Sequence, residues 1–329
     1  MPPKTTSFQH SDQTHNLQEH IQILRQECLE ATESIYLGDP HALERLTWID
    51  DGRESYVAEK VVSNDGETPV APKPILLSLI ARITHDDTFI IPDGNYKGPS
   101  EHLRELSDLK LTVALGRVSN TENPILGQDF DNAYSVITKL RGAKVYKNTN
   151  GVVGVLAVGA NDNKPKLKLR HKVFVAPDES DIHNASVAVN QSSENNVSEF
   201  ELAGYPVRSP EAKEELATIV TKGALVLAPL PAFERFDITD DSEPHKILPS
   251  QYTSHVQGSL AVVHFFLTHT FIAREHKHAF SADVFSILVF DPPAPQSLNS
   301  PRKLLGKRMA NYPFGSASKK AKGKGKGRA

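Results

Sequence analysis

The most regular spacing of charged residues in this sequence lies between residues 164 and 172. Every second position there is a cation: Lys164, Lys166, Lys168, Arg170 and Lys172. On a β-strand these five side chains would share one face, and the leucines between them would share the other. Lys144 and Lys147 come shortly before and would extend the same surface. Such a row attracts phosphate groups, but exposed lysines also serve to prevent edge-to-edge strand pairing, so both interpretations remain open.

A second group of cations lies in the last thirty residues. Two clusters are separated by a ten-residue spacer, Lys307 and Arg308 on one side and Lys319, Lys320 and Lys322 on the other. This is the layout of a bipartite nuclear import signal, because two cationic clusters on a spacer can fill two acidic grooves of one receptor. We therefore expect a nuclear protein with an import receptor as a partner. The Gly-Lys alternation that follows would add affinity for phosphates of any sequence.

The overall charge is distributed unevenly. Residues 301–329 contain ten Lys or Arg and no acid, so 27 of the 37 bases remain in residues 1–300 against 40 acids, a net charge of −13. An acidic body with a basic tail argues against a protein whose whole surface wraps nucleic acid. Any nucleic-acid contact should be local or made by the tail.

Aromatic and histidine side chains gather near residues 255–290. Small barrels of the oligonucleotide-binding type stack bases on rings such as Phe265, Phe266, Phe271, Phe280, Phe285 and Phe290. Because both alternating faces of this region are apolar, we predict that most of these rings lie in the core. The neighbouring histidines lack the spacing of a zinc site, and a single cysteine, Cys28, cannot form one, so we predict no metal.

Several classes of function lack their signatures. The sequence has no phosphate-binding GxxxxGK[ST] loop, no GxSxG, no HExxH and no GxGxxG motif. We therefore expect a protein that is not an enzyme and needs no cofactor. No apolar run is long enough to span a membrane, and the polar first twenty residues do not resemble a secretory signal.

The first element that must position these residues is a helix over residues 12–38, after a disordered segment 1–11. Its apolar positions recur at spacings of four and three along one seam: Leu17, Ile21, Leu24, Cys28, Ala31 and Ile35. The seam could pack against the protein's own body or form a homodimer, and we favour its own body.

The remaining pattern predicts an α+β, β-dominated fold with antiparallel sheets. We predict an α+β domain at residues 39–177, an acidic, polar linker or loop at 178–200, a β-rich domain at 201–292 and a disordered basic tail at 293–329. The first domain contains a helix at 129–140 and a meander of strands at 143–148, 152–158 and 166–175. The second contains a helix from 210 and two interior strands at 259–273 and 280–290, and it could close as a small barrel or sandwich.

The segments VYKNTNGVVGVLAV (145–158) and ILPSQYTSHVQGSLAVVHFFLTHTFIA with FSADVFSILVFDPP (247–292) resemble uncharacterised fungal proteins that also end in a Lys/Arg-rich tail. The resemblance covers most of residues 40–292 and rests on packing patterns. It implies a nuclear protein of restricted lineage and no particular activity.

Two hypotheses for function follow. The first is a non-enzymatic nuclear protein that binds single-stranded or duplex nucleic acid with the cation row and the tail. The second is a nuclear interaction or scaffold protein without a nucleic-acid site in its body. A row that lies on an open face near exposed rings would favour the first, and a row paired with Asp or Glu would favour the second.

Overall fold

The structure is a computed structural model that describes residues 9–52, 54–60, 72–101, 103–145, 149–177, 198–236 and 243–293, with only the backbone for residues 9–16. All of these residues belong to one compact unit, Met1–Ala294. Lys147, the import clusters and all but the first residue of the predicted tail lie outside the described residues. Within the described part of the chain, no helix has both the length and the apolar composition needed to cross a membrane.

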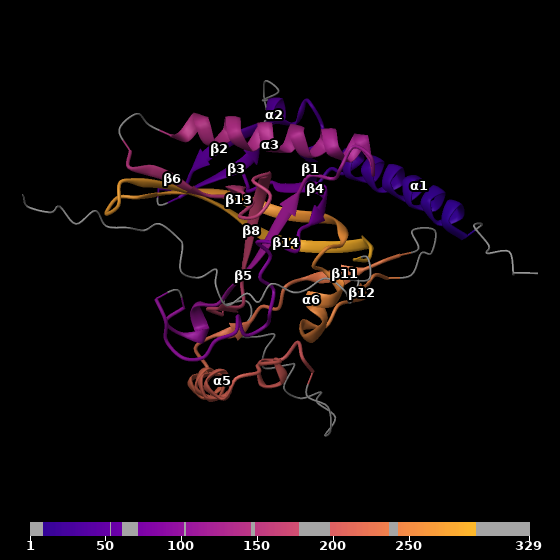
Figure 1. Cartoon of the computed structure of the whole chain (residues 1–329). Helices are drawn as coiled ribbons and strands as arrows, with labels where there is room; N and C mark the ends of the chain where they lie inside the picture. The colour runs from indigo at the N-terminus through magenta and orange to yellow at the C-terminus, as the bar shows by residue number, and fades with distance from the viewer. Residues whose placement is uncertain are drawn as a thin grey trace, which may run out of the picture. The chain divides into compact units, whose positions relative to one another are not determined.

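Five strands close into a barrel at the centre of this unit (Figure 1). They are β4 (Leu76–Ile83), β5 (Lys110–Gly116), β8 (Pro165–Lys172), β13 (Leu260–Ile272) and β14 (Lys277–Asp291). Neighbours pair antiparallel in the order β14-β13-β4-β5-β8, and a parallel pairing of β8 with β14 closes the ring. A three-stranded meander followed by a hairpin that joins both of its edges is the Greek-key topology of the oligonucleotide-binding barrel. The predicted α+β, β-dominated fold is confirmed.

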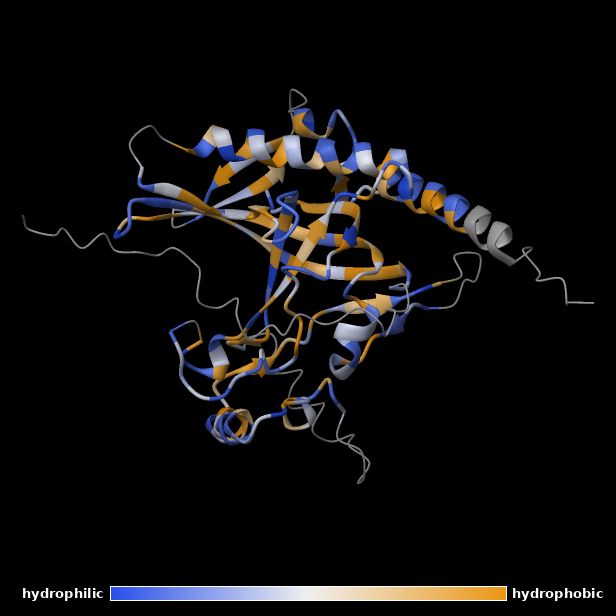
Figure 2. Cartoon of the chain, in the orientation of Figure 1, coloured by the Kyte–Doolittle hydropathy of each residue, from blue (hydrophilic) through white to orange (hydrophobic). Residues whose placement is uncertain are grey.

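Alternating side chains fill the barrel and explain its closure. On β5, Leu111, Val113 and Leu115 are buried, and Val113 and Leu115 lie opposite Leu169 and Leu167 of β8. Burying each such side chain contributes about 1.5–3 kcal/mol. Figure 2 shows the same apolar character along β13 and β14. The predicted interior strands at 259–273 and 280–290 are confirmed.

Shorter strands extend the barrel into one large mixed sheet. β2 (Leu46–Asp50) and β3 (Ser55–Glu59) continue it beyond β13, and β1 (Ser34–Tyr36) pairs parallel with β4. The other additions are β6 (Gly151–Gly154), β7 (Leu156–Val158), β11 (Ala232–Glu234) and β12 (His245–Lys246), while β9 (Phe174–Val175) and β10 (Val226–Leu227) form a separate pair. Parallel pairings of β14 with β6, β8 and β11 make the sheet mixed, whereas the sequence pattern predicted antiparallel sheets.

Gly154 lies where the pairing of the chain changes from one strand to another. It ends β6, which pairs with β14, and β7 then pairs with β8. It adopts φ +123°, and a Cβ atom there would lie 1.8 Å from the carbonyl oxygen of Phe280. Val155 then donates its N–H to that same oxygen, and Lys168 of β8 donates to the carbonyl of Val155. Only glycine permits this close crossing.

The two long helices, α1 (Gln9–Glu30) and α3 (Pro124–Lys144), pack on the sheet over β1 and β4 (Figure 1). Asn123 caps α3 by accepting the N–H of Leu126. Arg25 of α1 donates two hydrogen bonds to the buried Asp129 of α3. The other helices within the described residues are α2 (Ala42–Arg45), α5 (Pro210–Lys222) and α6 (Tyr252–His255), with 3-10 turns at Leu106–Asp108, Leu202–Gly204 and Pro249–Gln251.

The seam of the N-terminal helix faces the body of the same chain. Ile21, Leu24 and Cys28 are buried there, so they are covered without a second copy, as the favoured alternative predicted. The predicted helix 12–38 nevertheless starts earlier, at Gln9, and ends at Glu30. Ile35 belongs to β1 because the chain turns after Glu30 and pairs with β4. Ile35 fits the 4-3 spacing only because it is apolar and buried, as the seam residues of the helix are.

Two further expectations differ from the structure. Residues 143 and 144 continue α3 instead of starting a strand, because the helix packs along the sheet to its last turn. The predicted boundary at 178–200 does not separate two sheets, since β4, β5 and β8 come from before it and β13 and β14 from after it. Residues 178–197 themselves lie outside the described residues.

Candidate nucleic-acid interface

The cation row lies on the outer face of the barrel. In the pairing of β5 with β8, Lys110 is opposite Lys172, Thr112 opposite Arg170, Ala114 opposite Lys168 and Gly116 opposite Lys166. Opposite residues of an antiparallel pair point to the same face. The leucines between the cations of β8 fill the barrel, so these four cross-strand pairs lie on its outer face. The predicted alternation is therefore present in β8, while Lys164 precedes the strand and is exposed.

The first half of the row is covered by the loop between β4 and β5. Asp87 of this loop binds Lys166 at 3.3 Å and Lys168 at 3.8 Å. Asp162 lies 3.6 Å from Lys166, whose side chain is only 3% exposed. Lys166 and Lys168 are therefore neutralised by aspartates of the same chain. Pairing of the row with acidic residues is what the second hypothesis, an interaction or scaffold protein, predicted.

The second half of the row, Arg170 and Lys172, is open, and Lys110 of β5 lies beside it. Lys110 and Lys172 are both exposed and directly opposite each other, and neither forms an ion pair within the described residues. Arg170 forms an ion pair with Asp283 of β14 at 2.8 Å, with both side chains more than 40% exposed. Like charges directly opposite each other on neighbouring strands repel, and an exposed ion pair holds its partners weakly. This end of β8 can therefore accept an anion.

Two exposed rings flank these cations. Phe89, in the loop after β4, exchanges two 2.8 Å backbone hydrogen bonds with Thr112, and its side chain is 57% exposed. Phe285 is 53% exposed, two residues after Asp283, and its ring lies 5.8 Å from that of Phe266. Three strand spacings separate the chain at Phe89 from β14, about 14 Å.

We call this surface the open face. Its members are Phe89, Lys110, Thr112, Arg170, Lys172, Asp283 and Phe285. The sequence pattern did not predict Lys110 and Phe89, because neither has similar residues nearby in the sequence. Strand pairing brings Lys110 opposite Lys172 and Phe89 opposite Thr112. The predicted core rings Phe265, Phe280 and Phe290 are buried as expected, whereas Phe271 and Phe285 are exposed.

Lys144 is not part of the open face. Its ammonium group forms an ion pair with Asp50 and lies 5.9 Å from the centre of the Trp48 ring. Both partners belong to β2, the edge strand that four other strands separate from β8 in the sheet order. Lys144 therefore does not extend the cation row, because it lies in the last turn of α3 and its ammonium group is paired with Asp50 of β2.

Two histidines form a buried pair at the far end of the hairpin. His269 and His278 are joined by a 2.8 Å hydrogen bond between ring nitrogens, and the His269 ring packs against those of Trp48 and Phe280. Burial, together with the neighbouring His278, lowers the pKa of His269 to about 4. The described residues contain no group of three or more His, Cys, Asp or Glu that could hold a metal ion.

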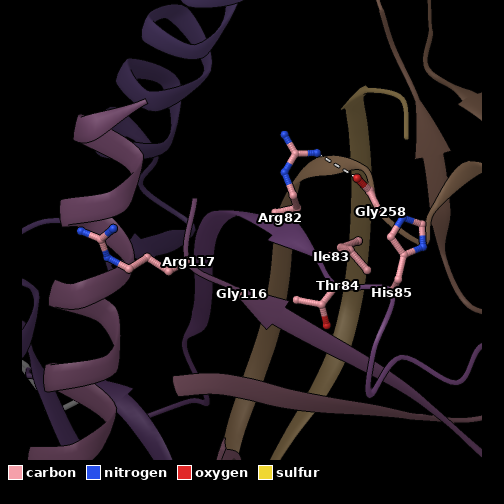
Figure 3. Close-up of a pocket in the computed structure, with 7 residues that line it drawn as sticks. All are labelled: Arg82, Ile83, Thr84, His85, Gly116, Arg117 and Gly258. Carbon is pink, nitrogen blue, oxygen red and sulfur yellow. Dashed lines mark hydrogen bonds between the residues drawn. The ribbon is translucent and has the colours of Figure 1, made fainter. Parts of the chain in front are cut away.

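A pocket of about 330 Å³ lies at the ends of β4 and β5 (Figure 3). Two arginines line it, but the chain's own oxygens bind both. Arg82 donates to the carbonyl of Gly258 at 2.8 Å and forms an ion pair with Glu122. Arg117 points away from Arg82 in Figure 3 and binds Asp131. Both arginines of the pocket therefore already have an acidic partner from this chain.

Comparisons with known proteins give little. No protein-family model matches the chain, and no curated protein matches its sequence. Among solved structures, the chain is similar to gp2.5, a single-stranded DNA binding protein encoded by bacteriophage T7, with 10% identity and a TM-score of 0.33. The match covers 68% of this chain and 96% of the phage protein. So low a similarity does not assign that protein's activity to this chain.

Proposed function

We propose that this chain binds single-stranded nucleic acid on the open face and catalyses no reaction there. The observation that carries the proposal is the pair Lys110 and Lys172, for which the described residues supply no ion-pair partner. The two lysines are held opposite each other on the strands that barrels of this topology use for oligonucleotides. A phosphate between them would relieve their repulsion. The rest of the body is acidic, which makes this pair a local attraction for a polyanion.

The exposed rings favour a single strand over a duplex. Phe89 and Phe285 stand on either side of the cations, and bases stack on such rings only when they are free of a complementary strand. A duplex offers phosphates to Lys110 and Lys172 but no free base faces to the two rings.

The test is fluorescence anisotropy with labelled single-stranded DNA, single-stranded RNA and duplex DNA at several salt concentrations. The full chain would be compared with a variant whose ten tail cations are changed to Gln, and with K110Q/K172Q in that background. Two lost phosphate contacts reduce the slope of log K against log salt by about 1.4 and the affinity at 0.1 M salt by about 25-fold. K60Q/K73Q, which removes two exposed lysines outside the open face, should change affinity by less than about twofold. Unchanged binding by K110Q/K172Q would refute the proposal.

The ion pairs of Lys166, Lys168 and Arg170 with aspartates support a second candidate, a protein-interaction role without nucleic-acid binding by the body. A chain that loses all nucleic-acid binding when only its tail is neutralised would favour this candidate.

We also propose nuclear localisation through Lys307, Arg308, Lys319, Lys320 and Lys322, which would bind an import receptor. The support is their two-cluster spacing. A fluorescent fusion of the full chain should accumulate in the nucleus and lose this on substitution of both clusters by Ala. Accumulation that survives the substitution would refute the assignment. The resemblance to fungal proteins likewise stays a prediction.

A further inference from the structure

The loop between β4 and β5 contributes to the open face in two opposite ways. Phe89 offers its ring to the surface beside Thr112, while Asp87, two residues earlier, points its carboxylate at Lys166 and Lys168. The loop is held along β5, since Ala114 donates its N–H to the hydroxyl oxygen of Thr88 at 3.0 Å.

The residues beneath the loop permit this crossing. The outer positions of β5 opposite Lys168 and Lys166 are Ala114 and Gly116, which leave room for the loop over the strand. A Cβ atom on Gly116 would lie 2.6 Å from the side chain of Thr84. Asp87 itself adopts φ +67°, a left-handed conformation that Asp and Asn tolerate better than most residues.

The carboxylate of Asp87 is the anionic partner of both Lys166 and Lys168. It is only 8% exposed, lies within 4 Å of both ammonium groups, and its Oδ2 atom also accepts the N–H of Ala160 at 3.3 Å. Lys166 has Asp162 as an additional partner, whereas Lys168 is 27% exposed and, among the described residues, has Asp87 as its ion-pair partner. Lys168 is thus the cation that a change at Asp87 would release.

We infer that Asp87 is a specificity-determining residue that limits the length of the nucleic-acid site. It closes the first half of the cation row and confines the phosphates to the half formed by Lys110, Arg170 and Lys172. This inference rests on the proposed function, because it concerns the same face and the same ligand. It predicts that removing the charge of Asp87 extends the site by one phosphate contact.

The test is a double-substitution cycle in the full chain with its tail cations changed to Gln, using a labelled single-stranded oligonucleotide. D87N should steepen the salt dependence by about 0.7 and tighten binding about fivefold at 0.1 M salt. K168Q alone should leave binding unchanged, and K168Q added to D87N should abolish the gain. D131N is the matched control, since it removes an aspartate that pairs with Arg117 outside the open face.

An equal effect of D87N and D131N would overturn the inference. If D87N does not fold, K168Q and K172Q still decide the matter, because the inference requires K172Q to weaken binding and K168Q to leave it unchanged; equal weakening would overturn it. If K110Q/K172Q weakens binding while D87N behaves like D131N, this inference alone fails. If neither the unsubstituted body nor D87N binds, the proposed function fails as well.

Discussion

The opposed lysines Lys110 and Lys172 allow stability and binding to be separated by one substitution. Lys110→Glu would replace a repulsive cross-strand pair by an attractive one on two exposed positions. Removing the repulsion and adding an attraction each contribute roughly 0.2–1 kcal/mol. We therefore expect the free energy of unfolding to rise by about 0.4–2 kcal/mol at low salt, a shift in Tm of a few degrees for a unit of this size.

The same substitution should weaken binding. It removes one phosphate contact and places a negative charge on the phosphate path, so the affinity for a single strand at 0.1 M salt should fall by at least about fivefold. K110Q should give an intermediate result in both measurements, because it removes the repulsion without adding an attraction.

The assays are thermal unfolding at low and high salt and anisotropy with a labelled oligonucleotide. A stability gain that shrinks at high salt, together with weaker binding, supports the pairing and its function. A destabilised K110E protein would contradict the strand register, and an undiminished affinity would contradict the role of Lys110 in binding.

Three more outcomes follow from the structure. F89A and F285A should each weaken single-strand binding by about 1–3 kcal/mol without changing the salt slope, because stacking is lost and no cation is removed; a changed slope or unchanged affinity in anisotropy would refute the stacking role. The folded pKa of His269 is about 4, below the unfolded value of 6.5, so the unfolded state binds more protons between these values. Stability is therefore full above pH 6.5 and should fall by up to about 3 kcal/mol as the pH drops to 4, with a flatter profile in H269Q by urea unfolding; an equally steep profile in H269Q would assign the effect elsewhere. D129A should cost about 3 kcal/mol in urea unfolding, because it leaves Arg25 and Tyr36 without their shared carboxylate, and a loss below 1 kcal/mol would contradict that role.

Local patterns were sufficient for much of the fold. The alternation of cations and leucines predicted the two faces of β8, and continuous apolar runs predicted β13 and β14. The helix predicted from residue 210 is α5, and at its start the hydroxyl oxygen of Ser209 accepts the N–H of Ala212. These features depend on residues close together in the sequence.

The site depended on pairings that local patterns do not contain. Lys110 meets Lys172, and Asp87 meets Lys166, only because a barrel brings segments far apart in the chain together. Ile35 extended the helical periodicity although it belongs to a strand, because burial on β1 and burial on α1 require the same residue type. Lys144 is close to the cation row in the sequence, but it lies in the last turn of α3, where it pairs with Asp50 of β2.

The central claim is that a single strand lies on the open face, and photo-crosslinking tests it most directly. A single-stranded oligonucleotide carrying photoreactive bases would be irradiated with the full chain, and its adducts located by mass spectrometry of the peptides. The structure predicts adducts at Phe89 or Phe285 whose yield falls in K110Q/K172Q. Adducts confined to residues 301–329, or to surfaces away from β5, β8 and β14, would contradict it.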